Sequence, residues 1–491
     1  MSQIKRDLIH GVFWSAIEKY SGLVMSIFIS MVLARLLSPK EYGVVAIATV
    51  IISFLQMFCT MGVAPAIIQR DDLNKDDVNS IFTYSILIGL FFAFIFFGCS
   101  EVIADIYEEP LLIPVCKILS IQVFFAAANM VPNALMSKNK RFKELARRTL
   151  TLQIFSGLTS IYLAWKGAGV YALLVSPIFS AIGIFIWNRL YYKVTITFRL
   201  NIEPVKKIFS FSAYQFLFDF FNYFSRNFDK IIIGKYIGIN PLGVYEKSYR
   251  LMQLPLNNIS FVINPVLQPV LRCLQNDHEE LNKKYLKLIK FVASLSFPLG
   301  VLLSESACEV IRLFYGSKWD SAIPVFEILA LSLPLQMILS TSGAICLVCN
   351  NTKMQFFLGA RNTITTIIGF FIAAFFFKTI VAMAWAWTLT LGINFFVSYF
   401  LLYKKVLSVA QSMFWQELIK PFSCGILVWF TLWMLNNSEF HISLIPALLL
   451  KVLLCGTLSL GFYQISKQYD FIQEIKKRIN HGNLKKNKEC V

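Results

Sequence analysis

The stretch from Phe216 to Gln268 decides the fold and reads FLFDFFNYFSRNFDKIIIGKYIGINPLGVYEKSYRLMQLPLNNISFVINPVLQ. Polar residues interrupt this apolar stretch in two sets: Asp219, Asn222, Arg226, Asp229 and Lys230, and then Glu246, Arg250, Gln253, Asn257, Ser260, Asn264 and Gln268. At about 100° per residue, each set falls within one stripe of a helix. The stretch therefore predicts two neighbouring helices that each carry one polar face.

The composition predicts that these helices lie in a membrane. Hydrophobic residues make up 57% of the 491 residues and charged residues only 15%, whereas soluble domains carry roughly 25% charged residues. The mean hydropathy is +0.62. Because a membrane interior offers no water, a polar stripe on a membrane helix has to face something polar inside the protein.

Apolar runs of about 20 residues, the length that crosses a bilayer as a helix, recur along the chain. We expect an all-α integral membrane protein with about 14 transmembrane helices. They are placed at roughly 11–37, 42–64, 81–103, 113–136, 149–165, 171–192, 208–234, 242–271, 288–304, 322–348, 357–377, 381–403, 421–436 and 444–466. The polar, basic start of the chain lacks a cleavage site for a signal peptide, so the first helix is expected to be retained.

The basic residues predict the orientation. With the N-terminus inside, the inner segments hold 31 Lys and Arg and the outer segments hold six. This asymmetry places both termini in the cytoplasm. Topology also accounts for the net charge of +18, so we expect no nucleic acid partner. Every loop is short, which predicts that function is carried out within the membrane.

The chain repeats itself. At an offset of 200, Val32–Val44 aligns with Ile232–Val244, so that Arg35 falls on Lys235 and Gly43 on Gly243. At an offset of 210, the segment from Ile113 to Leu119 aligns with that from Ile323 to Leu329. We expect an N-terminal six-helix lobe over 1–200 and a C-terminal six-helix lobe over 208–405, followed by helices 13 and 14 over 406–466 and a basic cytoplasmic tail over 467–491. Parallel repeats of this kind are a transporter design with the substrate between the lobes.

Charges inside the spans are costly and need partners, water or a function. Arg35, Lys117, Lys247 and Arg361 lie near span ends, where extension of the side chain to the interface explains them. For the stripes, three hypotheses stay open: ion pairs such as Arg226 with Asp229 or Asp219 and Arg250 with Glu246; a hydrogen-bonded seam of Asn222, Asn257 and Asn264; or the lining of a hydrated cavity.

The cavity is favoured, because a structural seam would not need so many polar residues in register. A net cationic cavity selects an anion. We predict that Arg226, Lys230, Arg250, Asn222 and Asn257 bind the substrate, with Arg engaging phosphate bidentately. Prolines such as Pro255 and Pro334 permit kinks in the helices that carry them.

Metal or redox use is not expected. Cys346 and Cys349 form a CxxC within an apolar helix, without a second pair or a nearby His, and buried small residues explain them better. The four His are isolated, so we predict no metal site and no cofactor.

Five motifs in order carry a resemblance. They are Gly11-Val-Phe-Trp-Ser-Ala, Leu33-Ala-Arg-Leu-Leu-Ser-Pro-Lys-Glu-Tyr-Gly, Gly62-Val-Ala-Pro-Ala-Ile-Ile-Gln-Arg, Asp229-Lys-Ile-Ile-Ile-Gly-Lys with Leu242-Gly-Val-Tyr, and Phe314-Tyr-Gly-Ser-Lys-Trp-Asp-Ser-Ala-Ile-Pro-Val. On this layout the chain resembles the polysaccharide transporter family of the multidrug/oligosaccharidyl-lipid/polysaccharide flippase superfamily, in particular its colanic-acid and O-antigen flippase branch.

The resemblance implies a two-lobe fold and movement of an undecaprenyl-diphosphate-linked oligosaccharide from the inner to the outer leaflet of the inner membrane, for surface polysaccharide. It also suggests coupling to a proton or sodium gradient, for which Asp219 and Glu18 are the candidate carboxylates. It implies no enzyme activity. Two alternatives are weighed: a multidrug-type exporter, which predicts a net acidic or aromatic cavity, and a membrane glycosyltransferase or polymerase, which needs a catalytic carboxylate or His beside a long outer loop.

Overall fold

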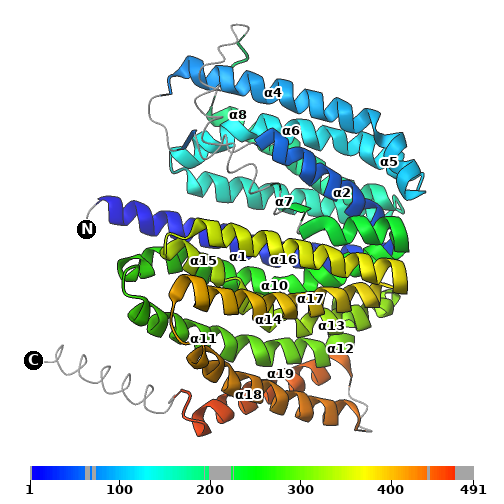
Figure 1. The fold of residues 1–491 in the computed structure, drawn as a ribbon. Helices are drawn as coiled ribbons and strands as arrows, with labels where there is room; N and C mark the ends of the chain where they lie inside the picture. Colours follow the sequence, from blue (N-terminus) through cyan, green and yellow to red (C-terminus); the bar gives the residue numbers. More distant parts are fainter. Residues whose placement is uncertain are drawn as a thin grey trace, which may run out of the picture. The chain divides into compact units, whose positions relative to one another are not determined.

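The computed structural model describes residues 3–60, 67–68, 73–192, 194–197, 220, 223–224, 226–438 and 443–469. Every regular element within these ranges is a helix (Figure 1). This follows from the composition, since a helix satisfies its own backbone hydrogen bonds in a medium without water. The predicted all-α membrane fold is confirmed.

The described chain divides into two compact units. The first comprises Met1–Glu246, Phe314–Trp319 and Phe370–Met383, and the second comprises Lys247–Leu313, Asp320–Gly369 and Ala384–Val491. α10 (Ile239–Leu271) begins in the first unit and continues in the second. The division into lobes at 1–200 and 208–405 rests on the sequence repeat and stays a prediction.

In the first unit, most helices pack against helices that do not directly follow them in the sequence. Its helices are α1 (Gln3–Leu36), α2 (Pro39–Thr60), α4 (Lys75–Gly98), α5 (Ser100–Tyr107), α6 (Leu112–Lys138), α7 (Phe142–Trp165), α8 (Val170–Tyr191), and the π-helices η1 (Ile233–Ile237) and η4 (Ala373–Phe377). α6 packs against α4, α8 and α2, and α7 packs against α1 and α8.

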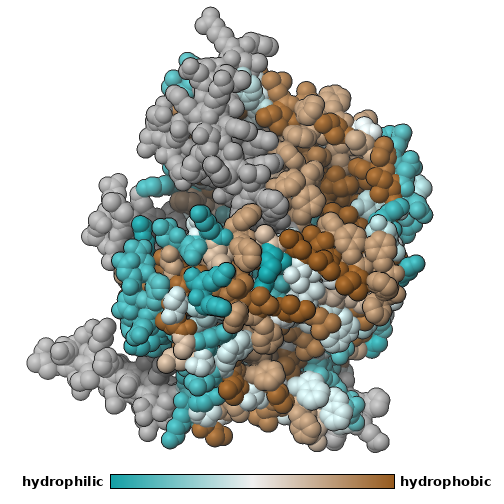
Figure 2. Space-filling model, viewed as in Figure 1, coloured by the Kyte–Doolittle hydropathy of each residue, from teal (hydrophilic) through white to brown (hydrophobic). Residues whose placement is uncertain are grey.

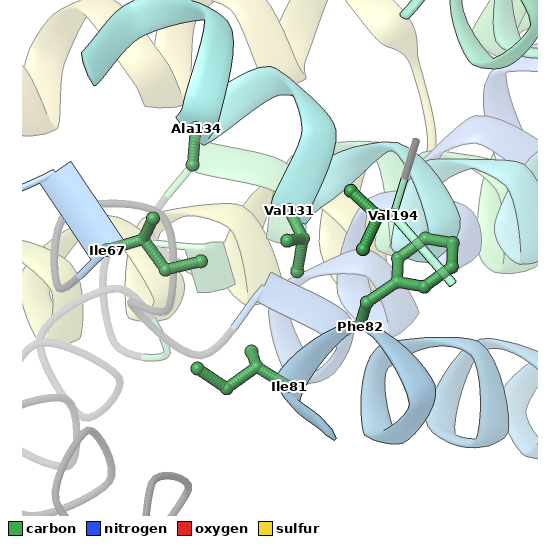
Figure 3. Close-up of a cluster of buried hydrophobic side chains, with 6 residues drawn as sticks. All are labelled: Ile67, Ile81, Phe82, Val131, Ala134 and Val194. Atoms are coloured by element: carbon green, nitrogen blue, oxygen red, sulfur yellow. The ribbon is translucent and has the colours of Figure 1, made fainter. Parts of the chain in front are cut away.

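A buried apolar cluster joins the ends of two of these helices, α4 and α6, to residues outside both helices. It contains Ile67, Ile81, Phe82, Val131, Ala134 and Val194. Figure 3 shows their side chains converging, with Phe82 lying next to Val194. The cluster ties the start of α4 to the end of α6 and to the extended residues after α8.

The second unit carries the remaining helices. They are α11 (His278–Glu305), α12 (Ala307–Phe314), α13 (Ile323–Leu331), α14 (Leu333–Leu339), α15 (Ser342–Val348), α16 (Thr352–Ile372), α17 (Ile380–Leu402), α18 (Ser412–Asn436) and α19 (Leu444–Ile465), with the short helices η2 (Arg272–Leu274), η3 (Ser317–Ala322) and η5 (Tyr403–Leu407). α11 packs against α13, α14 and α18, and α19 lies beside α11 and α18 (Figure 1).

Ten helices of the described residues are long and apolar enough to span a membrane, or eleven if the bent pair Ser317–Leu331 and Leu333–Val348 is one span. Large apolar side chains such as Phe94, Phe376 and Ile465 are exposed on them, and Figure 2 shows apolar residues covering broad stretches of the visible face. In water such a surface would aggregate. The chain is therefore a multi-pass membrane protein, while the count of fourteen spans stays a prediction.

Proline shapes one span as the sequence predicts. The predicted helix over 322–348 is broken at Ser332, immediately before α14, with a bend of 41°. Pro334 lies in the first turn of α14, where its missing N–H costs least. α10, in contrast, is assigned as one helix from Ile239 to Leu271 although it contains Pro255, Pro265 and Pro269.

The two repeated segments meet each other within the first unit. A Cβ atom added at Gly43 would collide with the carbonyl oxygen of Ile239, and one added at Gly243 would collide with the carbonyl oxygen of Pro39. Both pairs are related by the offset of 200 residues. A contact in which i meets j′ and j meets i′ is the signature of a two-fold relation.

Contacts near the two glycines also link each repeated segment to a part of the chain outside it. Lys235 donates to the carbonyl of Ile106 at 2.7 Å, and Trp319 donates through Nε1 to the carbonyl of Ala34 at 2.8 Å. Lys318 also reaches the carbonyl of Arg35, at 3.5 Å. The end of α5 thus contacts the second repeated segment, and the short helix Ser317–Ala322 (η3) contacts the first. This end of the unit is the one that the topology predicts to face outward.

The close approach makes the two glycines a test of the fold. Gly43→Ala and Gly243→Ala are each expected to destabilise the protein by about 1–3 kcal/mol, because backbone cannot yield to a methyl group as a side chain can. Gly392→Ala is the matched control, since nothing lies within 4 Å of its Cβ position. Alanine there should be neutral or stabilising by up to about 1 kcal/mol. The melting temperature of the solubilised protein reports all three, and equal melting of the three variants would contradict the contact.

Candidate functional site

The polar stripes predicted from the sequence are anchored by one ion pair. Residues 226–232 are helical and continue into η1. Lys230 lies in this segment and Glu246 on α10, and their side chains form an ion pair at 2.8 Å. The side chains are 15% and 23% exposed, so neither charge is sealed from its surroundings. The pair connects the two stripes near the start of α10.

This pairing differs from the two ion pairs that the sequence suggested. Glu246 is paired with Lys230 and not with Arg250, which lies one turn further on α10. Asp229 is 2% exposed and accepts a hydrogen bond from the backbone N–H of Lys230 at 2.8 Å. Arg226 is exposed instead of pairing with it. Glu246 therefore pairs with a residue of another helical segment and not with Arg250, the residue that helical spacing favoured.

The polar face of α10 is open while its other faces are packed. Arg250 and Asn257 are exposed, whereas Tyr245, Leu251 and Met252 are buried. Gln253 between them donates to the hydroxyl of Tyr249 at 2.7 Å. Arg226 is exposed in the same way on the preceding helical segment. The two guanidinium groups are thus accessible, each on a helix that carries further polar residues.

Some of the residues predicted to bind substrate or to couple transport cannot be placed. Asp219 and Asn222 lie outside the described residues, and so do the side chains of Ser260, Asn264 and Gln268. The hydrogen-bonded seam of Asn222, Asn257 and Asn264 therefore stays a prediction. The same holds for Asp219 as a coupling carboxylate.

The other candidate coupling carboxylate, Glu18, has a defined partner. Its Oε1 accepts a hydrogen bond from the hydroxyl of Thr149 at 2.8 Å, which links α1 to α7. Glu18 is half-buried and its neighbour Lys19 is exposed. The role of Glu18 as a coupling carboxylate stays a prediction.

Arg148 is a buried charge that the sequence did not identify. Its position in a run of basic residues predicts an inner loop, but it lies in the second turn of α7 and is 6% exposed. It donates to Asn133 at 2.7 Å and to Asn188, while Asn188 donates to Asn133 at 2.9 Å. The signal was the spacing of four that it shares with the buried residues Leu152, Ser156, Ser160 and Ala164.

Two of the charges expected at span ends are inside the protein. Arg361 donates to the carbonyl of Asn394 at 3.1 Å and to the hydroxyl of Ser398 at 3.0 Å, and Lys247 is 3% exposed. Lys117 does pair with the exposed Glu101 at 3.5 Å, as a residue at the interface would. Extension to the interface was therefore wrong for Arg361 and Lys247, because polar partners within the fold solvate them.

The second unit contains an apolar groove of about 480 Å³ between α11 and α19. Its lining is almost entirely apolar and comprises Phe291, Ser294, Leu295, Pro298, Leu299, Leu302, Val452, Cys455, Gly456, Ser459, Leu460, Tyr463 and Tyr469. Its floor is a buried cluster that includes Cys424, Val428 and Leu432 of α18. The groove is suited to a flexible hydrocarbon chain.

Each end of the groove carries a lysine. At one end, Lys290 lies with its Nζ 5.3 Å from the ring centroid of Tyr469. Near the other end, Lys451 is 3% exposed, pairs with Glu309 and donates to the carbonyl of Glu305 at 2.9 Å. The second lysine is neutralised inside the protein, whereas no carboxylate of the described residues forms an ion pair with the first.

Within the ranges given above, no group of three His, Cys, Asp or Glu side chains could hold a metal ion. Cys346 and Cys349 are free thiols, the first buried and the second half-buried. The apolar helix around them accounts for both.

The chain is similar in sequence to known polysaccharide proteins. The model of the family described as "Polysaccharide biosynthesis protein" matches residues 32–324. The teichuronic acid biosynthesis protein TuaB of Bacillus subtilis (strain 168) is 24% identical over 428 residues, which cover 86% of this chain and 87% of that protein. The lipopolysaccharide biosynthesis protein WzxC of Escherichia coli (strain K12) is 24% identical over 430 residues, 85% of each.

Two solved structures share the fold. The lipid II flippase MurJ in an inward closed conformation superposes with a TM-score of 0.72 and 16% identity, covering 94% of this chain and 100% of MurJ. An inward-facing multidrug resistance MATE transporter of the MOP superfamily gives a TM-score of 0.61 and 13% identity over 88% of this chain and 100% of its own. Since the family model matches more than half of its residues, the chain belongs to the polysaccharide biosynthesis protein family.

Proposed function

We propose that the protein is a flippase that moves undecaprenyl-diphosphate-linked oligosaccharide repeat units from the inner to the outer leaflet by alternating access. The product would be used to assemble a surface polysaccharide such as O-antigen, capsule or exopolysaccharide. The protein would reside in the inner membrane with both termini in the cytoplasm. Transport within the membrane, and not catalysis, is its role in this proposal.

The observation that carries the proposal is that the guanidinium groups of Arg226 and Arg250 are both exposed on helices of a membrane protein. An exposed charge on a membrane helix is expensive unless it faces water or a ligand. A guanidinium presents a planar fork of donors that matches two phosphate oxygens. Lys230, held by Glu246, and Asn257 are further polar residues proposed to bind substrate.

The apolar groove between α11 and α19 supports the same class of substrate. A lipid-linked sugar has a hydrocarbon chain that stays in the membrane while its headgroup crosses. A groove lined by apolar side chains can hold such a chain against the protein. The names of the relatives, which refer to teichuronic acid and lipopolysaccharide biosynthesis, agree with a substrate on the route to a surface glycan.

The reciprocal contact at Gly43 and Gly243 supports alternating access. A substrate released on the outer side would have to pass the outward-facing end, where this contact closes the first unit. A contact made by bare backbone at two points carries no side chain of its own that would have to move when the segments separate. Glu18, hydrogen-bonded to Thr149, and Asp219 are the carboxylates proposed to couple this opening to a proton or sodium gradient.

Arg226→Ala and Arg250→Ala are each expected to lower delivery of lipid-linked repeat units to the outer leaflet by roughly ten- to a hundredfold, since a charge-assisted hydrogen bond contributes about 1.5–3 kcal/mol. Delivery is measured in cells as surface polysaccharide and as lipid-linked intermediates retained inside. Arg147→Ala is the matched control, because Arg147 is exposed and pairs only across one helical turn with Glu144. Normal delivery by well-expressed Arg226→Ala and Arg250→Ala proteins would reject the cationic site.

Glu18→Gln tests the coupling. The amide keeps an acceptor for Thr149 but cannot change its charge, so transport by this variant should no longer respond to the proton gradient. The measurement is transport rate in proteoliposomes with and without an imposed pH difference. Thr149→Val, which removes the donor but leaves the carboxylate, should retain the response. A Glu18→Gln variant that responds like the unmodified protein would exclude Glu18 as the coupling group.

A further inference from the structure

The end of the apolar groove near Lys290 is built around one buried amide. Gln468 is 5% exposed, and its Nε2 donates to the hydroxyl of Ser294 at 2.8 Å. The hydroxyl of Tyr463 donates to the carbonyl of the same serine at 2.8 Å. These bonds fix the residues after α19 against α11. The ring of Tyr469 is thereby positioned beneath the ammonium group of Lys290, four residues before Ser294.

The ammonium group of Lys290 is left available by this arrangement. No carboxylate of the described residues forms an ion pair with it, and its contact is with the face of the Tyr469 ring. A cation on an aromatic face is attracted by the ring quadrupole, and this contact leaves its positive charge in place. Lys290 is half-buried, at the point where the apolar lining of the groove ends.

The charge around the groove is distributed unevenly. At the Lys290 end, Lys420 donates to the carbonyl of Ser466 at 2.8 Å and Lys467 is exposed, with Glu417 one turn before Lys420 on α18. At the other end, Lys451 is neutralised by Glu309, and the carboxylate of Glu305 accepts from Asn436 at 2.8 Å. An anion is therefore favoured at the Lys290 end and disfavoured at the Lys451 end.

We propose that the Lys290 end of the groove is an entrance site that holds the diphosphate of a polyprenyl diphosphate while the first part of its chain lies in the groove. This site is separate from Arg226 and Arg250, and it rests on the proposed function because it assumes a lipid-linked substrate. The predicted topology places it at the cytoplasmic face, where such a substrate would arrive.

Length and charge favour this occupant over a diacyl phospholipid. The α11 lining from Phe291 to Leu302 extends about 17 Å at 1.5 Å per residue, and it forms one groove of about 480 Å³, which suits a single chain better than two. A diphosphate also carries more negative charge than a phosphodiester. Three lysines against one glutamate complement the more highly charged headgroup.

The test is a binding titration with purified full-length protein in nanodiscs of zwitterionic lipid. The probes are geranylgeranyl diphosphate and geranylgeraniol, which share one chain and differ in the headgroup. Lys290→Gln should weaken binding of the diphosphate at least tenfold and change binding of the alcohol by less than twofold. Lys290→Arg should restore most of the affinity. Titration in an Arg226→Ala, Arg250→Ala background isolates this site from the other cationic groups.

Lys287→Gln is the matched control, because Lys287 is an exposed lysine one turn earlier on α11; its effect should stay below twofold. Leu299→Trp, which fills the groove, should weaken both probes. Unchanged diphosphate affinity in Lys290→Gln would overturn the proposal. So would displacement of the diphosphate by phosphatidylglycerol with equal affinity, which would indicate a general site for anionic phospholipid.

The entrance site and the proposed function can be rejected independently of each other. If diphosphate binding depends on Lys290 but the protein does not flip lipid-linked oligosaccharide, the proposed function is wrong and the entrance site stands. If flipping depends on Arg226 and Arg250 while Lys290→Gln binds the diphosphate normally, the entrance site is wrong and the function stands.

Discussion

The close approach of two backbone segments at Gly43 and Gly243 is the constraint on which the first unit depends. Each glycine faces a carbonyl oxygen of the other segment, so any side chain at either position would separate them. The contact is made twice by equivalent residues, and the surrounding bonds from Lys235 and Trp319 follow the same exchange. Bare backbone gives the closest approach two helices can make, and it supplies attraction where the hydrophobic effect is absent in lipid. Buried side chains such as Trp319 pack around this contact.

Around this constraint, the intramembrane charges fall into two groups. Arg148, Arg361 and Lys451 have their charge satisfied by amides, carbonyls or a carboxylate inside the fold, and they hold helices together. Arg226 and Arg250 are exposed, and Lys290 rests on an aromatic ring at the end of a groove. The distinction is physical: a charge with polar partners within the fold is compensated, whereas an open one depends on water or on a ligand. In the proposed function, these open charges would bind the anionic headgroup of the lipid.

The fold could be predicted from the sequence because its two signals extend over many residues. They are the hydropathy of the spans and the repeat that aligns Arg35 with Lys235 and Gly43 with Gly243. The bend at Ser332 was signalled by Pro334, since a missing N–H weakens a helix locally. The partners of charged residues could not be predicted. Helical spacing favoured Arg250 for Glu246, but Lys230 reaches it from another helix. Arg148 resembled a loop residue because the basic run before it conceals where α7 begins. The groove was not foreseen, because an apolar lining has the same composition as a surface that faces lipid.

The central proposal is that this polytopic protein carries a lipid-linked oligosaccharide across the bilayer. The direct measurement is a reconstitution assay in proteoliposomes that contain a fluorescent undecaprenyl-diphosphate-linked oligosaccharide in both leaflets. A membrane-impermeant reagent that quenches the label reports the fraction of lipid exposed outside. We expect the protected half to become accessible in liposomes that contain the protein and to stay protected in protein-free liposomes. An identical protected fraction in both preparations, with correctly folded protein, would contradict the account.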